Sequence, residues 1–82
     1  MEVRRGQIMR SLAGHDKGDF QVALRLEGEF AYMADGKRRK LELPKKKKLK
    51  HLAPTGTVLG EERLSTNRQI RTALAKYREH TT

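Results

Sequence analysis

The residues of this sequence that could do chemistry are mainly cations, and they gather in segment 37–50. The chain of 82 residues has 19 Lys plus Arg against 10 Asp plus Glu, which gives a net charge of +9. Segment 37–50 supplies nearly all of this excess, and its single acid is Glu42. Its basic residues are Lys37, Arg38, Arg39, Lys40, Lys45, Lys46, Lys47, Lys48 and Lys50. Lysine amines and arginine guanidinium groups bind phosphate oxygens, so the segment predicts a polyanionic partner, RNA before any other.

The same run of charge has other interpretations. It could be a solvated loop that serves solubility alone, a nuclear import signal, or a polybasic attachment to anionic lipid. Like charges at this density repel one another unless a partner neutralises them, which favours nucleic acid. Lipid ranks last because no bulky apolar face accompanies the charge, and no apolar run approaches the roughly 18 residues of a membrane span. We therefore expect a cytoplasmic protein without membrane contact.

A second candidate is the loop Gly14-His15-Asp16-Lys17-Gly18. Both glycines can take a positive φ, and the carboxylate of Asp16 can hydrogen-bond the backbone of its own turn. Lys17 would then be held beside backbone N–H groups, where an RNA phosphate or base could approach. The contacts predicted in this loop are His15, Lys17 and Gly18. The alternative is a hairpin turn that needs glycine only for its geometry.

Other chemistry finds little support in the sequence. There is no cysteine, and His15, His51 and His80 lie far apart without a paired-ligand spacing, so no metal site is expected. No nucleophile stands at a recognisable spacing from a histidine and an acid, and there is no GxxxxGK[ST] loop. We expect no catalytic residues, no cofactor and no enzyme activity. The RNA contacts predicted from Arg38 onward are Arg38, Arg39, Lys40, Lys45, Lys46, Lys47, Lys48, Lys50 and His51.

The loop and the basic segment need elements to position them. Ile8–Leu12 predicts a short strand before the loop, and 19–26 alternates with a period of two, which predicts a second. The side chains that would share one face of this second strand are Phe20, Val22, Leu24 and Leu26. A third strand at 29–34 would put Phe30 and Tyr32 on one face. We expect Tyr32 in the core and Phe30 partly exposed, although such aromatics could also stack on bases.

Tight turns and a proline divide the next part of the chain. Glu27-Gly28 predicts a turn, and Asp35-Gly36 predicts a type I′ hairpin that leads into a fourth strand at 37–43. Pro44 would stop further central pairing, because it lacks a backbone N–H. Residues 45–48 would then form a solvated loop, because neighbouring lysines repel one another.

Residues 56–59 could form a last short strand or a strap across the end of the barrel, after Pro54 ends the apolar residues 49–52. Five short strands joined by tight turns favour a closed or nearly closed barrel, since closure removes exposed sheet edges. The expected core is Ile8, Leu12, Phe20, Val22, Leu24, Leu26, Tyr32, Leu41, Leu43, Leu49, Leu52 and Val58. The sequence does not decide whether Ile8 or Met9 points inward.

A helix is predicted at 66–79. Thr66 and Gln69 form a capping box, in which each side chain accepts a hydrogen bond from the backbone N–H of the other residue. The apolar positions that recur at helical spacing are Ile70, Ala73, Leu74 and Tyr77. A helix of this length is marginal alone in water, so we expect it to dock on the barrel or on a partner. The predicted organisation is a barrel at 1–60, followed by a connector and this helix at 61–82.

Part of the sequence resembles the KOW motif, a strand-loop-strand element of ribosomal proteins and transcription elongation factors. The residues that carry the resemblance are Gly6, Ile8, Gly14, Asp16, Lys17, Gly18 and Val22. It extends through Ala34-Asp35-Gly36 and segment 44–52, and it covers roughly residues 3–60. Asp19 departs from it, because such motifs often carry a basic residue there. Over this range the chain is similar to large-subunit ribosomal proteins of archaea and eukaryotes, the fourteen-e type in particular.

The resemblance implies both a fold and a function. The implied fold is mainly β, a small SH3-like barrel of about five strands, here followed by the C-terminal helix. The implied function is non-enzymatic RNA binding, with ribosomal RNA as the partner and a ribosomal or ribosome-associated role in translation. The alternative is a protein-interaction module of the transcription or translation machinery, which would use the barrel or the C-terminal helix. A monomer is expected.

Overall fold

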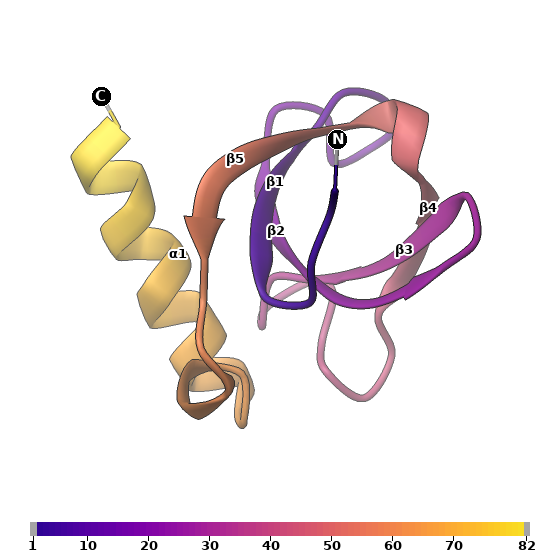
Figure 1. Cartoon of the computed structure of the whole chain (residues 1–82). Coiled ribbons are helices and arrows are strands. Elements are labelled where there is room, and N and C mark those ends of the chain that lie inside the picture. The colour runs from indigo at the N-terminus through magenta and orange to yellow at the C-terminus, as the bar shows by residue number, and fades with distance from the viewer. Residues whose placement is uncertain (1, 82) are drawn as a thin grey trace.

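Five antiparallel strands form one sheet in the computed structural model, which describes residues 2–81 of the chain (Figure 1). The strands are β1 (Gln7–Ser11), β2 (Phe20–Glu27), β3 (Phe30–Ala34), β4 (Lys45–Lys48) and β5 (Leu52–Val58). Two 3-10 turns, η1 (Leu49–His51) and η2 (Glu61–Arg63), and the helix α1 (Asn67–Thr81) complete the fold. The expected mainly β fold with a C-terminal helix is confirmed.

The sheet is curved like a small barrel but stays open. Its strand order is β4-β3-β2-β1-β5, so β4 and β5 form its two edges. Figure 1 shows the strands curling round until η1 joins these two edges directly. Backbone hydrogen bonds fix η1 in place. The N–H of Leu49 donates to the carbonyl of Glu29 at 2.8 Å, and the N–H of Leu12 donates to the carbonyl of His51 at 2.9 Å.

Both faces of the sheet bury apolar side chains. The inner face of the curl packs Met9, Ala23, Ala31, Met33 and Leu52. The helix α1 lies outside the curl and covers part of the opposite face, which we call the outer face (Figure 1). The side chains packed there include Ile8, Val22, Leu24 and Ala34 from the strands and Ile70, Ala73 and Leu74 from α1. Because adjacent residues of a strand face opposite sides, Ile8 and Met9 are both buried, each in a different core.

Several side chains expected in the core are exposed instead, namely Leu12, Leu26, Leu43 and Val58. The first lies just beyond the end of β1, and the last ends the edge strand β5. In β2, a register shift between Ala23 and Arg25 interrupts the alternation, so the expected apolar face does not continue to Leu26. Leu43 belongs to a loop and is 82% exposed. The expected core residues that are only half-buried are Phe20, Tyr32, Leu41 and Leu49.

The segment 35–44 is a loop, so the prediction of a strand at 37–43 is wrong. Gly36 has a positive φ of 79°, but Asp35 does not, so the type I′ hairpin does not form. Instead the Oδ1 atom of Asp35 accepts hydrogen bonds from the backbone N–H groups of Lys37 at 2.8 Å and Arg39 at 2.9 Å. This self-bonded loop delays the return strand until Lys45. The lysine run expected to be a solvated loop is therefore strand β4.

Two further boundaries differ from the expectation. The turn between β2 and β3 is at Gly28-Glu29, one residue later than predicted, because Glu27 already pairs with Phe30. Pro54 does not end the apolar segment, since it lies within β5 and pairs with Met9. A proline is tolerated there because β5 is an edge strand, whose outer side has no neighbour to receive a backbone N–H.

The helix begins as the sequence predicts. The N–H of Gln69 donates to the hydroxyl of Thr66 at 3.1 Å, and the N–H of Thr66 donates to the Gln69 side chain at 3.1 Å. The capping box is confirmed, and α1 runs two residues beyond the predicted end, to Thr81. Its apolar stripe docks on the outer face of the sheet, where the ring of Tyr77 meets Phe20 edge-on at 5.1 Å between centroids. The segments predicted as barrel and helix thus share one hydrophobic core.

Candidate nucleic-acid interface

Strand β4 places four successive lysines at an edge of the sheet. Antiparallel pairing sets Lys46 opposite Tyr32 and Lys48 opposite Phe30, on the outer face. Lys47 lies opposite Ala31, on the inner face, and its side chain is only 10% exposed. Because successive strand residues point to opposite faces, one run of identical residues is divided between two environments.

Asp16 is the centre of a buried cluster of charges. Its side chain is 2% exposed, and its Oδ2 atom lies 3.0 Å from Nζ of Lys47 and 3.0 Å from Nε of Arg39. The same oxygen accepts a 3.1 Å hydrogen bond from Nε2 of Gln21, while Nζ of Lys47 also donates to the hydroxyl of Ser11 at 2.9 Å. Burial by itself would raise the pKa of Asp16, but the hydrogen bonds from Arg39, Lys47 and Gln21 outweigh it and lower the pKa to about 2. The carboxylate is therefore ionised at neutral pH.

The loop that carries Asp16 has the expected backbone conformation, but the Asp16 side chain has different partners from those expected. Gly14 and Gly18 have positive φ angles of 79° and 91°, as predicted. Backbone bonds close the turn, including one from the N–H of Gly18 to the carbonyl of Ser11 at 2.7 Å. The Asp16 side chain was expected to bond its own turn, but it points inward to Arg39 and Lys47 instead. It thereby ties three parts of the chain together: the loop between β1 and β2, the loop 35–44, and strand β4.

A shallow hollow of about 480 Å³ joins the glycine loop to the lysine strand. The predicted RNA contacts that line it are His15, Arg39, Lys45, Lys46, Lys47, Lys48 and His51. They come from four separate parts of the chain: the β1–β2 loop, loop 35–44, β4 and η1. The fold therefore brings together the two candidate regions that the sequence analysis treated separately.

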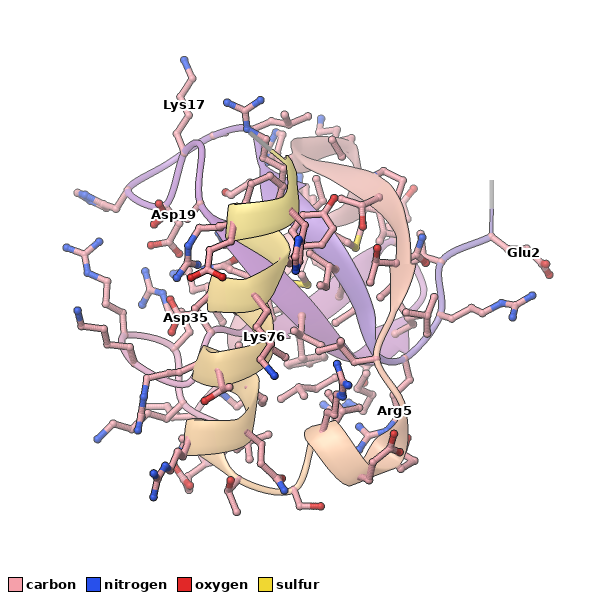
Figure 2. All side chains as sticks on the ribbon, turned by 90° about the vertical axis from the view of Figure 1, so that its left-hand side faces the viewer. Glu2, Arg5, Lys17, Asp19, Asp35 and Lys76 are labelled. Atoms are coloured by element: carbon pink, nitrogen blue, oxygen red, sulfur yellow. The ribbon has the colours of Figure 1, made fainter. Side chains whose placement is uncertain are left out.

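The other predicted contacts lie around this hollow rather than in it. Arg38 and Lys40 share a neighbouring hollow of about 300 Å³ with Arg39 and Lys45. Lys50 lies with Lys48 beside the turn between β2 and β3. Gly18 and Arg38 line a third hollow of about 550 Å³, which is bounded on its other side by α1. Lys17 projects from the tip of its loop, away from the body of the molecule (Figure 2).

Most cations of segment 37–50 have no ion-pair partner among residues 2–81. Arg39 and Lys47 pair with Asp16. The only acid of the segment, Glu42, instead accepts hydrogen bonds from the side-chain amide of Asn67 at 2.9 and 3.1 Å. The basic residues of the segment without an acidic partner within 4.0 Å are Lys37, Arg38, Lys40, Lys45, Lys46, Lys48 and Lys50. This side of the molecule carries positive charge that its own acids do not neutralise.

The outer face next to β4 carries a group of aromatic and basic side chains whose proximity was not predicted from the sequence. The guanidinium of Arg25 lies 4.1 Å from the ring centroid of Tyr32, and Nζ of Lys46 lies 4.4 Å from that of Phe30. Tyr32 was expected in the core, but it is half-buried on this face. The period of two in β3 already put Phe30 and Tyr32 on the same side. What it did not show is that α1 covers this face only as far as Ala34.

Metal sites and membrane spans were also considered in residues 2–81. No group of three or more His, Asp or Glu side chains there is placed to hold a metal ion. The helix α1 is neither long enough nor apolar enough to cross a membrane.

Comparison with known proteins gives this chain no family assignment. A scan of its sequence against protein-family models finds no match. A search of curated proteins also finds none with significant similarity.

Proposed function

We propose that this protein is a non-enzymatic RNA-binding protein that holds RNA phosphates along the lysine edge of its sheet. The observation that carries the proposal is the set of exposed lysines on β4. Lys45, Lys46 and Lys48 are exposed, lie on an edge strand, and have no acid within ion-pair distance among residues 2–81. Each phosphate that such a lysine neutralises releases condensed counterions, which favours binding at low salt.

The strand geometry makes this edge a better phosphate surface than a flexible loop would be. The backbone of β4 is fixed by pairing with β3, so ordering it on binding costs no backbone entropy. Lys47 and Arg39 are withdrawn from the proposed contacts because both charges are paired with Asp16. The remaining predicted contacts of the hollow, His15 and His51, are exposed beside the lysines and can add hydrogen bonds or stacking.

The class of RNA we propose is structured RNA, with ribosomal RNA first. Folded RNA is recognised mainly through phosphates, 2′-hydroxyls and shape, which suits lysines better than a base-reading groove. The KOW-like glycine loop borders the lysine hollow, and its resemblance to ribosomal proteins supports a ribosomal or ribosome-associated role. The alternative of a protein partner docking on the helix is less favoured, because the apolar stripe of α1 is used inside the domain.

A salt titration of RNA binding tests the proposal. The test variant carries Lys45→Gln, Lys46→Gln and Lys48→Gln. The matched control carries Arg63→Gln, Arg68→Gln and Lys76→Gln, which removes the same charge from exposed positions around α1, where Figure 2 shows Lys76. We expect the plot of log affinity against log salt to lose a slope of about 1 per lysine that contacts phosphate in the test variant. We expect the control to keep the slope of the wild type.

The same three proteins can be followed in cell lysates on sucrose gradients at low and high salt. The ribosomal role predicts that the wild type and the control co-migrate with the large subunit and that the lysine variant shifts to lighter fractions. Equal slopes for the two variants would remove the lysine edge from the proposal. Binding to purified RNA without co-migration at either salt would keep RNA binding and reject the ribosome.

A further inference from the structure

The outer face of β3 carries two aromatic rings that α1 leaves uncovered. Ala34, Tyr32 and Phe30 share this face, and only Ala34 belongs to the core under the helix. Both rings are half-buried, and cations lie over them. Lys46 is 4.4 Å from the Phe30 centroid and 6.0 Å from the Tyr32 centroid, and Arg25 is 4.1 Å from the Tyr32 centroid.

The cations over the rings are held only by weak contacts. Lys46 is exposed and has no acidic partner within 4.0 Å among residues 2–81. The side chain of Arg25 is 64% exposed, and its one acid, Glu27, lies 3.7 Å away, which is a weak contact at an exposed site. An exposed cation–aromatic contact is worth only about 0.5–1 kcal/mol. An RNA phosphate can therefore draw either cation off its ring and leave the ring face open.

The rings are continuous with the proposed phosphate surface. Phe30 lines the same hollow as Lys46, Lys48 and His51. An RNA strand whose phosphates follow β4 would thus have its bases beside the rings of the neighbouring strand β3. Proteins that bind single strands use this combination of a basic track with aromatic stacking surfaces.

The spacing of the rings decides which form of RNA they suit. Side chains two residues apart on a strand are about 6.8 Å apart. Neighbouring bases in a DNA duplex rise by only roughly 3.4 Å. In any duplex, the faces of the bases are already occupied by their neighbours in the stack. The two rings can therefore each take one base of an extended, unpaired strand, but they cannot stack on the bases inside a duplex.

We infer that Phe30 and Tyr32 form a stacking platform for two unpaired bases, so that the RNA bound is a single-stranded segment, such as a loop or bulge of a folded RNA. This inference rests on the proposed function and specifies its substrate. Phosphates contact Lys46 and Lys48, and the bases on the same side of the backbone cover the rings. The shared π-face of all bases makes the platform tolerant of sequence.

The experiment compares two RNA probes and one double variant. The probes are a short unstructured oligoribonucleotide rich in uridine and a fully paired RNA duplex with the same number of phosphates. Phe30→Leu with Tyr32→Leu keeps apolar bulk on β3 but removes both ring faces. We expect single-strand affinity to fall by about 5- to 150-fold for each stacked base, with an unchanged salt slope, and duplex affinity to stay as in the wild type.

A fluorescence signal tests the same contact in a protein that retains the platform. The chain has two tyrosines and no tryptophan, so Tyr77→Phe leaves Tyr32 as the only strong emitter. Tyr77 contacts Phe20 through its ring, which the phenylalanine keeps. Stacking on a base quenches tyrosine emission, so the single strand should quench this variant and the duplex should not.

The outcomes separate this inference from the proposed function. Loss of single-strand affinity together with quenching of Tyr32 supports the platform. Lysine-dependent binding of both probes, without quenching and without an effect of the double variant, overturns the platform and keeps the RNA-binding proposal. Failure of the wild type to bind either probe overturns both.

Discussion

Lys46 and Lys47 are neighbours in the sequence, yet they have opposite situations in the fold. Lys47 is almost enclosed, pairs with Asp16 at 3.0 Å and donates to Ser11. Lys46 is exposed, has no acid within 4.0 Å in the described part of the chain, and lies over the ring of Phe30. Strand parity turns the two side chains to opposite faces of β4, and Asp16 lies beside only one of them. A basic run is therefore not one functional unit once it becomes a strand.

The arginines before β4 show the same division. Arg39 pairs with Asp16, and its side chain is 30% exposed. Arg38 is exposed and lines two surface hollows. Segment 37–50 thus contains an inner pair, Arg39 and Lys47, and an outer set of cations. The inner pair holds β4 and loop 35–44 against the glycine loop, and the outer set depends on this frame for its position.

The largest effect is expected from removing Asp16, the acid that pairs with both Arg39 and Lys47. Asp16→Asn would leave Arg39 and Lys47 without their counter-charge in a largely buried site. We expect the free energy of unfolding to fall by about 3 kcal/mol, the lower end for a broken buried pair because Arg39 keeps some contact with water. Urea unfolding at neutral pH measures the change.

Asp19→Asn is the matched control, because Asp19 is an exposed acid of the same loop. It should change the free energy of unfolding by no more than about 0.5 kcal/mol. Equal effects of the two substitutions would contradict the view that the Asp16 cluster organises the interface.

Acid should weaken the inner pair in the unmodified protein. The pKa of Asp16 is about 2 in the fold against an ordinary value of 3.8, so the unfolded chain takes up the proton first as the pH falls. The stabilisation from Asp16 is complete above about pH 5 and is lost as the pH falls from there through 2. A difference of nearly two pKa units corresponds to about 2–3 kcal/mol. Unfolding curves collected at a series of pH values from about 6 to about 2 measure this loss.

The control for this titration is the Asp16→Asn variant, whose stability is itself expected to depend on pH. The pKa of Glu61 is also lowered, by its hydrogen bonds from Arg5, so another carboxylate titrates in the same direction. The wild type should lose more stability than Asp16→Asn over this range. Parallel losses in the two proteins would show that Asp16 is not the group responsible.

The parts of the fold that were predicted correctly depend on short stretches of sequence. The capping box of Thr66 and Gln69, the positive φ angles of Gly14 and Gly18, and the strand β3 are all specified by residues within a few positions of one another. The strand predicted at 37–43 failed because Asp35 could bond the backbone two and four residues ahead, which competes with a hairpin.

Strand β4 was missed for a different reason. Repulsion between neighbouring lysines was taken to favour a loop, but a strand separates them onto alternate faces and places one of them beside Asp16. That partner lies more than thirty positions earlier in the chain, so no local pattern could reveal it. The candidate contacts were identified by type, whereas their division into inner and outer residues depends on the register of β4 on β3.

The smallest expected effects come from replacing one lysine of β4 at a time. Lys47→Gln removes the ion pair to Asp16 and the bond to Ser11, while Arg39 and Gln21 still satisfy the carboxylate. We expect a loss of about 1–2 kcal/mol in the free energy of unfolding. Lys48→Gln, at an exposed site with no acidic partner within 4.0 Å among residues 2–81, should change it by no more than about 0.5 kcal/mol.

The same two variants should behave in the opposite way toward RNA. Lys48→Gln should lower the salt slope of binding by about 1, because one phosphate contact is lost, whereas Lys47→Gln should leave the slope unchanged. The free energy of unfolding and the salt slope should be measured for both variants. Together they distinguish a lysine that positions β4 from a lysine that contacts phosphate, which neither variant does alone. If Lys47→Gln lowered the salt slope without a loss of stability, Lys47 would be a phosphate contact, and the division of β4 by parity would not describe how the protein uses its charge.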